Sequence, residues 1–114
     1  METNDLKQIV WIGSSLDDLR ESPEEVKDAV GYALYEAQHG EMPAKAKPMK
    51  GLSGVIEIKT DYHGDTYRTV YAVKLYVLHV FKKKSKKGIS TPKPDMNVIK
   101  SRLKTAQHLA GESK

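Results

Sequence analysis

Residues 66–88 read TYRTVYAVKLYVLHVFKKKSKKG and form the richest run of strand-forming residues in the chain. β-Branched and aromatic residues favour a pleated, half-buried surface, so this run predicts β-structure. Five lysines within six positions follow the apolar part, and Arg68 interrupts it. An arginine inside a strand must face solvent or an anionic group, because a buried, unpaired charge is very costly.

The run is too long to be one strand. Sixteen extended residues would span roughly 50 Å at ~3.3 Å per residue, whereas a domain of this length is only about 35 Å across, given a radius of gyration of ~13 Å. The chain must therefore fold back on itself. Lys74-Leu75 is the predicted turn, because it is the one pair in the middle of the run with neither a β-branched nor an aromatic residue.

Length and composition limit the class of protein. The chain has 114 residues, of which 39% are hydrophobic and 30% are charged, and this predicts one soluble globular domain over residues 1–114. No apolar run approaches the ~18 residues of a membrane span, and the acidic N-terminal residues do not resemble a secretory signal. Cysteine is absent, which excludes disulfides and thiolate catalysis and fits a cytoplasmic location.

The segments before residue 66 predict a strand, two helices and another strand. The apolar residues before Gly13 indicate the first strand. A short helix follows from Ser14-Ser15, with Ser15 and Asp18 as a capping box, and Ser22-Pro23-Glu24-Glu25 is typical of a second helix start. In chain order, the predicted elements are a strand at 8–12, helices at 15–21 and 23–39, a loop at 41–50, and a strand at 54–60 with Ile56 and Ile58 facing the core.

The C-terminal part completes the predicted fold. A turn at 61–65 joins the strand at 54–60 to residue 66, so three consecutive strands form an antiparallel meander. Apolar residues spaced along residues 95–110 indicate a last helix, which ends before Gly111. The order of strand, two helices, three strands and helix predicts an α+β fold, with the helices on one side of a mostly antiparallel sheet.

Charge is distributed unevenly along the chain. Residues 1–41 carry three Lys or Arg against ten Asp or Glu, whereas residues 82–114 carry ten against two. A clustered basic surface favours a polyanionic partner, because phosphate contacts supply affinity. The alternative interpretation is a solvated surface on which the charges balance. We favour the polyanion because the lysines are clustered.

The sequence offers one candidate site. Arg68, Lys59 and the lysines at 82–84 come from three consecutive predicted strands and can converge at one edge. Arginine binds a phosphate with two parallel hydrogen bonds. Crowded lysines lower one another's pKa, and such a lysine can act as a general acid or base in RNA cleavage without a metal. The alternative is a phosphate-binding face with no chemistry.

Other chemistries have no pattern in this sequence. No glycine-rich phosphate loop, Ser-His-Asp arrangement or metal-ligand cluster is recognisable, so no metal and no cofactor are predicted. The four histidines fall on different predicted elements and are interpreted as structural or surface residues: His39, His63, His79 and His108.

Three segments together resemble the RelE/ParE toxin superfamily of bacterial type II toxin–antitoxin systems, and in particular its phage-derived, HigB-like host-killing branch. They are Val10–Ser15 with Leu19 and Pro23; Lys50–Ile58; and Thr66–Tyr71 through Val77–Ser85 with Thr91-Pro92. The Tyr-Arg-x-x-Tyr strand and the His-x-Phe-x-Lys-Lys run are the most specific parts of the resemblance.

The resemblance implies a RelE-like fold and a ribosome-dependent mRNA endonuclease. In that family the RNA 2′-hydroxyl attacks the adjacent phosphate and leaves a 2′,3′-cyclic end. Arg68 matches the phosphate-stabilising arginine, Lys83 matches a basic catalytic position with Lys82 beside it, and Lys59 falls near the family's general-base strand. The basic residues expected to bind RNA are Lys84, Lys86, Lys87 and Lys50.

The chain departs from the family in two places. Its Lys74-Leu75 turn is short, and its last helix has no tyrosine where many RelE enzymes carry a catalytic one, so the general base and acid stay open. The partners implied are mRNA on the ribosome and a cognate helix-turn-helix antitoxin of the HigA or Xre type. Two alternatives are a ParE-like inhibitor of DNA gyrase and a non-catalytic nucleic-acid-binding module.

Overall fold

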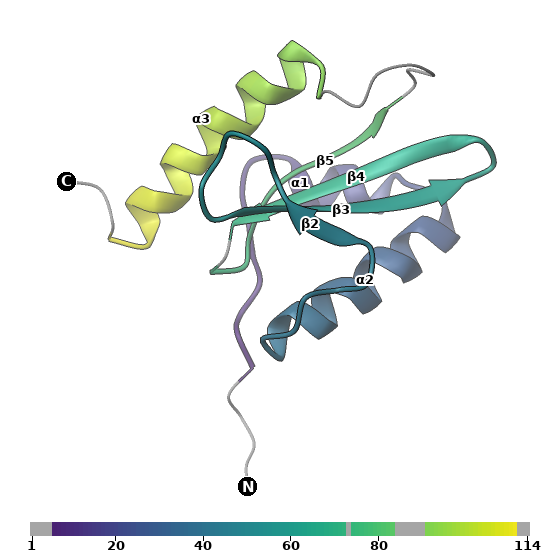
Figure 1. The fold of residues 1–114 in the computed structure, drawn as a ribbon, viewed down its shortest axis with the longest axis horizontal. Helices are drawn as coiled ribbons and strands as arrows, with labels where there is room; N and C mark the ends of the chain where they lie inside the picture. Colours follow the sequence, from purple (N-terminus) through teal and green to yellow (C-terminus); the bar gives the residue numbers. More distant parts are fainter. Residues whose placement is uncertain (1–5, 73, 84–90, 112–114) are drawn as a thin grey trace, which may run out of the picture.

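The computed structural model describes residues 6–72, 74–83 and 91–111, and these build an α+β fold with a mixed sheet (Figure 1). In chain order the elements are β1 (Val10–Trp11), α1 (Ser15–Arg20), α2 (Glu24–Gln38), β2 (Ala46–Pro48), β3 (Val55–Tyr62), β4 (Asp65–Ala72), β5 (Tyr76–Lys83) and α3 (Lys93–Leu109). The predicted order of strand, two helices, meander and helix is confirmed, with β2 as an addition.

The sheet has the strand order β1-β5-β4-β3-β2. The meander of β3, β4 and β5 is antiparallel as predicted, and β2 joins its edge antiparallel to β3. β1 pairs in parallel with β5, Val10 opposite Tyr76 and Trp11 opposite Val77. The segment before Gly13 is therefore strand over two residues only, and part of the predicted 41–50 loop is an edge strand.

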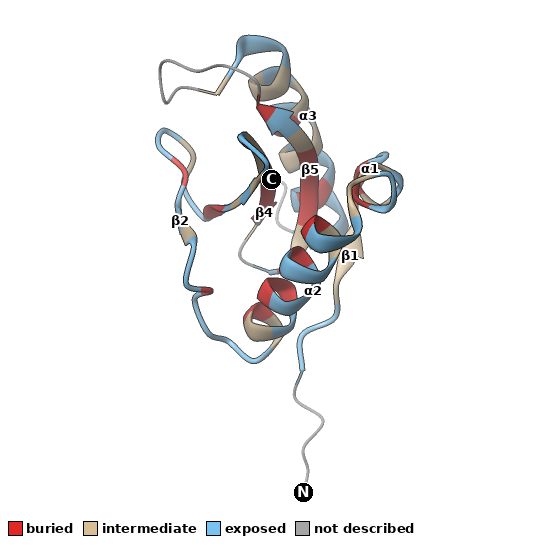
Figure 2. Cartoon of the chain, turned by 90° about the vertical axis from the view of Figure 1, so that its right-hand side faces the viewer, coloured by how far each residue is buried: buried red, intermediate tan, exposed pale blue. Residues whose placement is uncertain are grey.

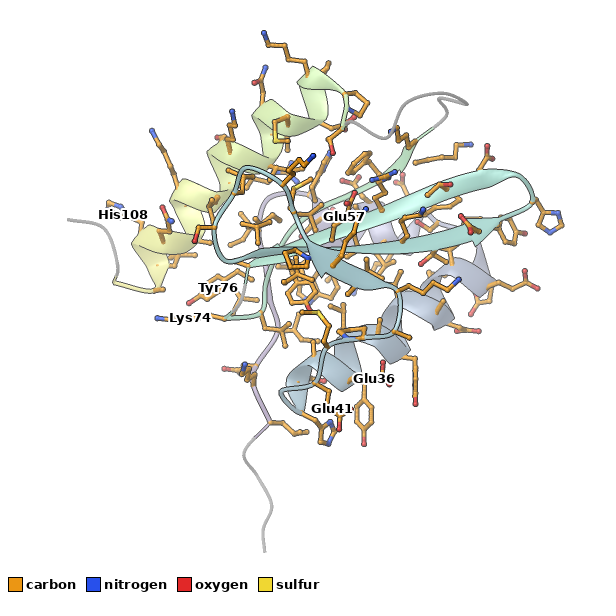
Figure 3. All side chains as sticks on the ribbon, in the orientation of Figure 1. Glu36, Glu41, Glu57, Lys74, Tyr76 and His108 are labelled. Atoms are coloured by element: carbon orange, nitrogen blue, oxygen red, sulfur yellow. The ribbon has the colours of Figure 1, made fainter. Side chains whose placement is uncertain are left out.

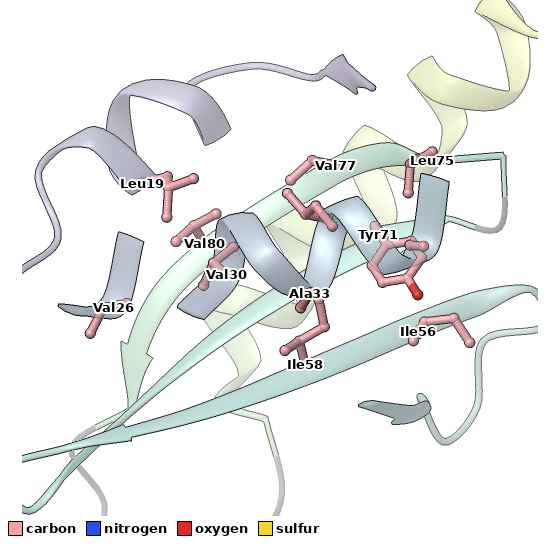
Figure 4. Close-up of a cluster of buried hydrophobic side chains, with 12 residues drawn as sticks. Leu19, Val26, Val30, Ala33, Ile56, Ile58, Tyr71, Leu75, Val77 and Val80 are labelled. Carbon is pink, nitrogen blue, oxygen red and sulfur yellow. The ribbon is translucent and has the colours of Figure 1, made fainter. Parts of the chain in front are cut away.

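The helices cover both faces of the sheet, so the prediction that they lie on one side is wrong. Figure 1 shows α3 above the sheet and α2 below it. One apolar cluster joins Val30 of α2 to Ile56 and Ile58 of β3 (Figure 4). The other joins Ile99 of α3 to Val55 of the same strand. Since neighbouring residues of a strand point to opposite faces, the two clusters lie on opposite sides of the sheet, and Figure 2 shows buried residues on both sides.

The predicted turn at Lys74-Leu75 is confirmed: β4 ends at Ala72 and β5 begins at Tyr76. The amide of Leu75 donates to the carbonyl of Ala72 at 2.7 Å. Leu75 has φ of 69° and is also fully buried in the α2-side cluster. A positive φ is costly for a residue with a Cβ, and the burial of this side chain offsets that cost.

The predicted serine caps are wrong. Ser15 lies inside α1 and is buried, and its hydroxyl donates to the carbonyl of Val77 in β5. Ser22 donates to the carbonyl of Asp18, and α2 begins at Glu24 without a side-chain cap. The buried hydroxyl of Ser15 thus finds its partner in another element, and the Ser22 hydroxyl bonds back to α1.

Arg102 links α3 by hydrogen bonds to β5 and to the residue before α1. Its guanidinium donates to the carbonyl of Leu78 at 3.0 Å and to the hydroxyl of Ser14 at 3.2 Å. Gly13 has φ of 60°, and a Cβ built there would lie 2.5 Å from Nε of Arg102. The sequence places glycine where the guanidinium passes, because any larger residue would collide with it. Among the described residues, no helix has both the length and the apolarity needed to cross a membrane.

Candidate functional site

Charged side chains gather on the α3-facing side of the sheet, next to the N-terminal end of α3. Cross-strand pairing sets them in rows, because residues opposite each other point to the same face. The three rows are Glu57, Val70 and His79; Lys59, Arg68 and Phe81; and Asp61, Thr66 and Lys83. Val70 belongs to the apolar cluster under α3, and Phe81 packs against that cluster.

Arg68 and Glu57 form a buried ion pair across the β3–β4 ladder. Nη1 of Arg68 donates to Oε2 of Glu57, and the two residues are only 6% and 4% exposed. Figure 3 shows Glu57 over the middle of the sheet. The Nε of Arg68 is buried and has no hydrogen-bond partner within the described part of the chain. The arginine therefore meets an anionic group, as its position in a strand requires, and keeps a donor for another acceptor.

His79 lies on the other side of β4 from Glu57. Its Nε2 is hydrogen bonded to Oδ1 of Asp95 at 2.8 Å, and its ring stacks on Phe81 with centroids 4.7 Å apart. Nδ1 is buried and has no partner among residues 6–72, 74–83 and 91–111. Asp95 and Phe81 thus fix the orientation of the imidazole.

Lys83 is also buried on this face, at 6% exposed. Desolvation lowers the pKa of its ammonium, the charges of Arg68 and Lys59 lower that pKa further, and Glu57 partly opposes them. Low dielectric and like charges both disfavour an added proton. The predicted crowding of cations is therefore present around Lys83.

A hollow of about 670 Å³ adjoins this face, and both Glu57 and Lys50 line it. Lys59 is exposed and stands opposite Arg68 in the ladder. The structure thus brings together four of the residues predicted to form the site: Arg68, Lys83, Lys59 and Lys50.

Lys82 is not brought to this face. Its ammonium lies 3.6 Å from the carboxylate of Asp65 and 5.9 Å from the centroid of the Tyr67 ring. Tyr67 packs against the α2-side cluster, so Lys82 occupies the opposite side of the sheet. A bulge between Val70 and Tyr71 shifts the register of β5 by one residue, and this shift places Lys83 on the Arg68 face. The other predicted RNA-binding residues lie outside the described residues: Lys84, Lys86 and Lys87.

Sequence reasoning missed three residues of this arrangement. Glu57 and Asp95 were not among the predicted site residues, and His79 was interpreted as a structural or surface residue. The alternation of Glu57 with Lys59 on one strand is the signal that could have found the first. No spacing in the sequence brings Asp95 to His79, because the two residues belong to different elements, α3 and β5.

The remaining histidines are elsewhere. Nδ1 of His39 is hydrogen bonded to the carbonyl of Tyr35, and His63 forms the β3–β4 turn. Figure 3 shows His108 near the C-terminal end of α3, away from Glu57. In the part of the chain that the structure describes, no three His, Asp or Glu residues are grouped as metal ligands.

Side chains of the kinds that bind phosphate and transfer protons stand on three neighbouring strands of this face. Arg68 offers donors to a phosphate, and a carboxylate and an imidazole stand on the two flanking strands. A family model described as phage-derived protein Gp49-like matches residues 17–104. No curated protein and no solved structure matches the chain.

Proposed function

The chain belongs to the phage-derived Gp49-like family, which is a RelE/ParE-like toxin family, and from this premise we propose that it is the toxin of a type II toxin–antitoxin system. We further propose that it is a ribosome-dependent mRNA endonuclease acting in the cytoplasm. The observation that carries this proposal is the grouping of Arg68, its ion-pair partner Glu57 and the imidazole of His79 on three neighbouring strands of one sheet face.

The reaction we propose needs no metal. The RNA 2′-oxygen attacks the neighbouring phosphorus while a general base takes its proton. The bond from phosphorus to the 5′-oxygen breaks, and a general acid protonates that leaving oxygen. The products are a 2′,3′-cyclic phosphate and a 5′-hydroxyl. Because the entering and leaving oxygens lie on opposite sides of phosphorus, the base and acid must flank the phosphate.

Glu57 and His79 fit these two positions. They stand in one row of the sheet, on the strands that flank β4. We assign Glu57 as the base and His79, oriented by Asp95, as the acid. Arg68 and Lys83 stabilise the negative charge that develops on phosphorus, which is the contact that gains most in the transition state. Lys59 and Lys50 hold neighbouring phosphates, and the substrate phosphate takes the place of Glu57 beside the guanidinium.

Inducing the chain in bacteria and mapping transcript 5′ ends tests the proposal. Wild-type chain should produce new 5′-hydroxyl ends within translated messages. His79→Gln should reduce their number by ~10²–10⁴, the usual contribution of a general acid. His63→Gln is the matched control, because His63 lies exposed on a hairpin turn, and it should cleave like the wild type.

Two other outcomes would replace this proposal. Growth arrest with no new transcript ends but with DNA damage would indicate a ParE-like gyrase inhibitor. RNA binding without growth arrest or cleavage would indicate a nucleic-acid-binding module. We also propose that a helix-turn-helix antitoxin neutralises the chain, and co-purification with the product of the adjacent gene, together with suppressed cleavage, tests that partner.

A further inference from the structure

The hollow beside Glu57 is the second feature of this face. At about 670 Å³ it is larger than four other hollows on the described surface, which measure about 260 to 350 Å³. Pockets for small ligands generally span about 300–1,000 Å³. Its size therefore suits one nucleotide, whereas a phosphate group alone would leave most of it unfilled.

The hollow lies between the β2 edge of the sheet and the beginning of α3. Lys47 stands opposite Glu57 in the β2–β3 ladder, so its side chain shares the α3-facing side. The amide of Met49 donates to the carbonyl of Val55 at 2.8 Å, which continues the pairing past β2. On the other side, Thr91 and Met96 come from the start of α3 and the residues before it.

The walls and the rim differ in chemistry. Met49 is buried, and Met96 packs against the same apolar cluster, so two thioether side chains form apolar walls. Thioethers are polarizable and make favourable contacts with aromatic rings. Lys47 and Lys50 are exposed at the rim. Apolar walls for a flat ring, beside ammonium groups for phosphates, are complementary to a nucleotide.

The hollow adjoins the Glu57–Arg68 pair, and this position indicates which nucleotide of an RNA strand would occupy it. Glu57 lines the hollow and also contacts Arg68, so a ring in the hollow lies next to the phosphate position. We propose that the hollow binds the purine base of the nucleotide adjoining the scissile phosphate, and this inference rests on the proposed function for the identity of the strand. A purine presents more ring surface to the two methionines than a pyrimidine does.

Binding of single nucleotides to the free protein tests the subsite without cleavage. The probes are adenosine and guanosine 3′-monophosphate, uridine 3′-monophosphate and inorganic phosphate, titrated against the whole chain by NMR. We expect the purine nucleotides to bind about tenfold more tightly than phosphate, near the upper end of what one thioether–ring contact supplies. Uridine nucleotide should fall between them. Equal affinity for all four probes would overturn the inference.

Variants locate the binding. Met96→Ala should remove most of the purine advantage and leave phosphate binding unchanged, and Thr91→Trp should do the same by filling the hollow. Met42→Ala is the matched control, since Met42 is an exposed methionine outside the hollow. Purine binding that survives both Met96→Ala and Thr91→Trp would place the base elsewhere and overturn the inference.

The two proposals fail separately. A chain that binds purines in this hollow but creates no transcript ends removes the proposed nuclease and keeps the subsite. A chain that cleaves messages, with mapped ends that show the same base composition in wild type and Thr91→Trp, keeps the nuclease and removes the subsite.

Discussion

Glu57 and Arg68 hold each other's charge out of water on the α3-facing side of the sheet, one residue from each of two adjacent strands. Removing one member of a buried ion pair leaves the other charge buried without a partner. This lowers the free energy of unfolding by ~3–5 kcal/mol. A variant that removes only one of the two charges therefore loses stability as well as any activity that depends on the charge.

We expect Arg68→Ala to lower the free energy of unfolding by about 3–5 kcal/mol, because it leaves the Glu57 carboxylate buried and unpaired. The double variant Arg68→Met with Glu57→Gln should be less destabilised than Arg68→Ala. Urea denaturation of each protein measures both effects. Arg68→Lys keeps a charge but loses the planar fork, so it is the variant in which the activity loss reports on phosphate contact. A double variant less stable than Arg68→Ala would refute the buried-charge account.

The second prediction concerns Lys83 and pH. Its pKa is lowered in the folded chain from an ordinary value of 10.5, first by desolvation. Between the lowered pKa and 10.5 the unfolded chain binds more protons, so this residue makes stability rise with pH there. Below the lowered pKa its charging cost is fully present. Lys83→Met should therefore be stabilised relative to wild type most at neutral pH, and the difference should shrink as pH approaches 10.5.

Thermal unfolding of both proteins from pH 7 to 10.5 checks this expectation. The comparison within one pH cancels the ionisation of other groups, including Tyr71, whose pKa burial raises. A difference between wild type and Lys83→Met that does not vary with pH would show that the ammonium carries no such cost.

The third prediction contrasts two glycines. Gly13→Ala should destabilise the chain by at least ~1–2 kcal/mol, because alanine at φ of 60° is strained and its Cβ would collide with the guanidinium of Arg102. Gly31→Ala is the control. Gly31 lies inside α2 with open space around it, and alanine there should add about 0.5–1 kcal/mol. Chemical denaturation measures both, and equal effects of the two substitutions would contradict the assignment of Gly13 to the Arg102 contact.

The fourth prediction concerns salt. Replacing Lys47 and Lys50 by Gln should lower the dependence of log K on log salt for single-stranded RNA by about 1.4, at ~0.7 per phosphate contact. Lys82→Gln should change the slope little, because Lys82 lies on the opposite face beside Asp65. Fluorescence titrations of an RNA oligomer between 50 and 200 mM salt, the range in which such losses are pronounced, provide the slopes. A larger effect from Lys82 than from the pair would assign RNA to the other side of the sheet.

Strand alternation allowed the meander to be predicted. The length of the 66–81 run required a turn, and the lack of β-branched and aromatic residues at Lys74-Leu75 placed it there. The sequence also contains a signal for helices on both faces of the sheet. Val55-Ile56 and Val77-Leu78 are consecutive apolar residues, and the two members of each pair belong to the clusters on opposite faces. The edge strand Ala46–Pro48 could not be predicted, because three residues ending in proline are too few to show the alternation of apolar and polar residues that marks a strand.

The site was predicted less well than the fold because it depends on one irregularity. Counted from the hairpin without a bulge, Lys82 would share a face with Arg68. The register shift at Val70/Tyr71 moves Lys83 there instead. Nothing in a single sequence marks such a bulge, and the approach of Asp95 to His79 likewise depends on where α3 packs.

The parallel pairing of β1 with β5 delays the completion of the sheet during synthesis. Residues 10 and 11 find their partners only at residues 76 and 77, so the first strand stays unmatched until most of the chain has emerged from the ribosome. Contacts between such distant residues form slowly, and domains complete their folding only once their late segments are available. Since β5 also supplies His79 and Lys83, a chain interrupted before it would lack both the closing strand and the groups that we assign to cleavage. A nascent fragment of this protein should therefore be harmless to the ribosome that makes it.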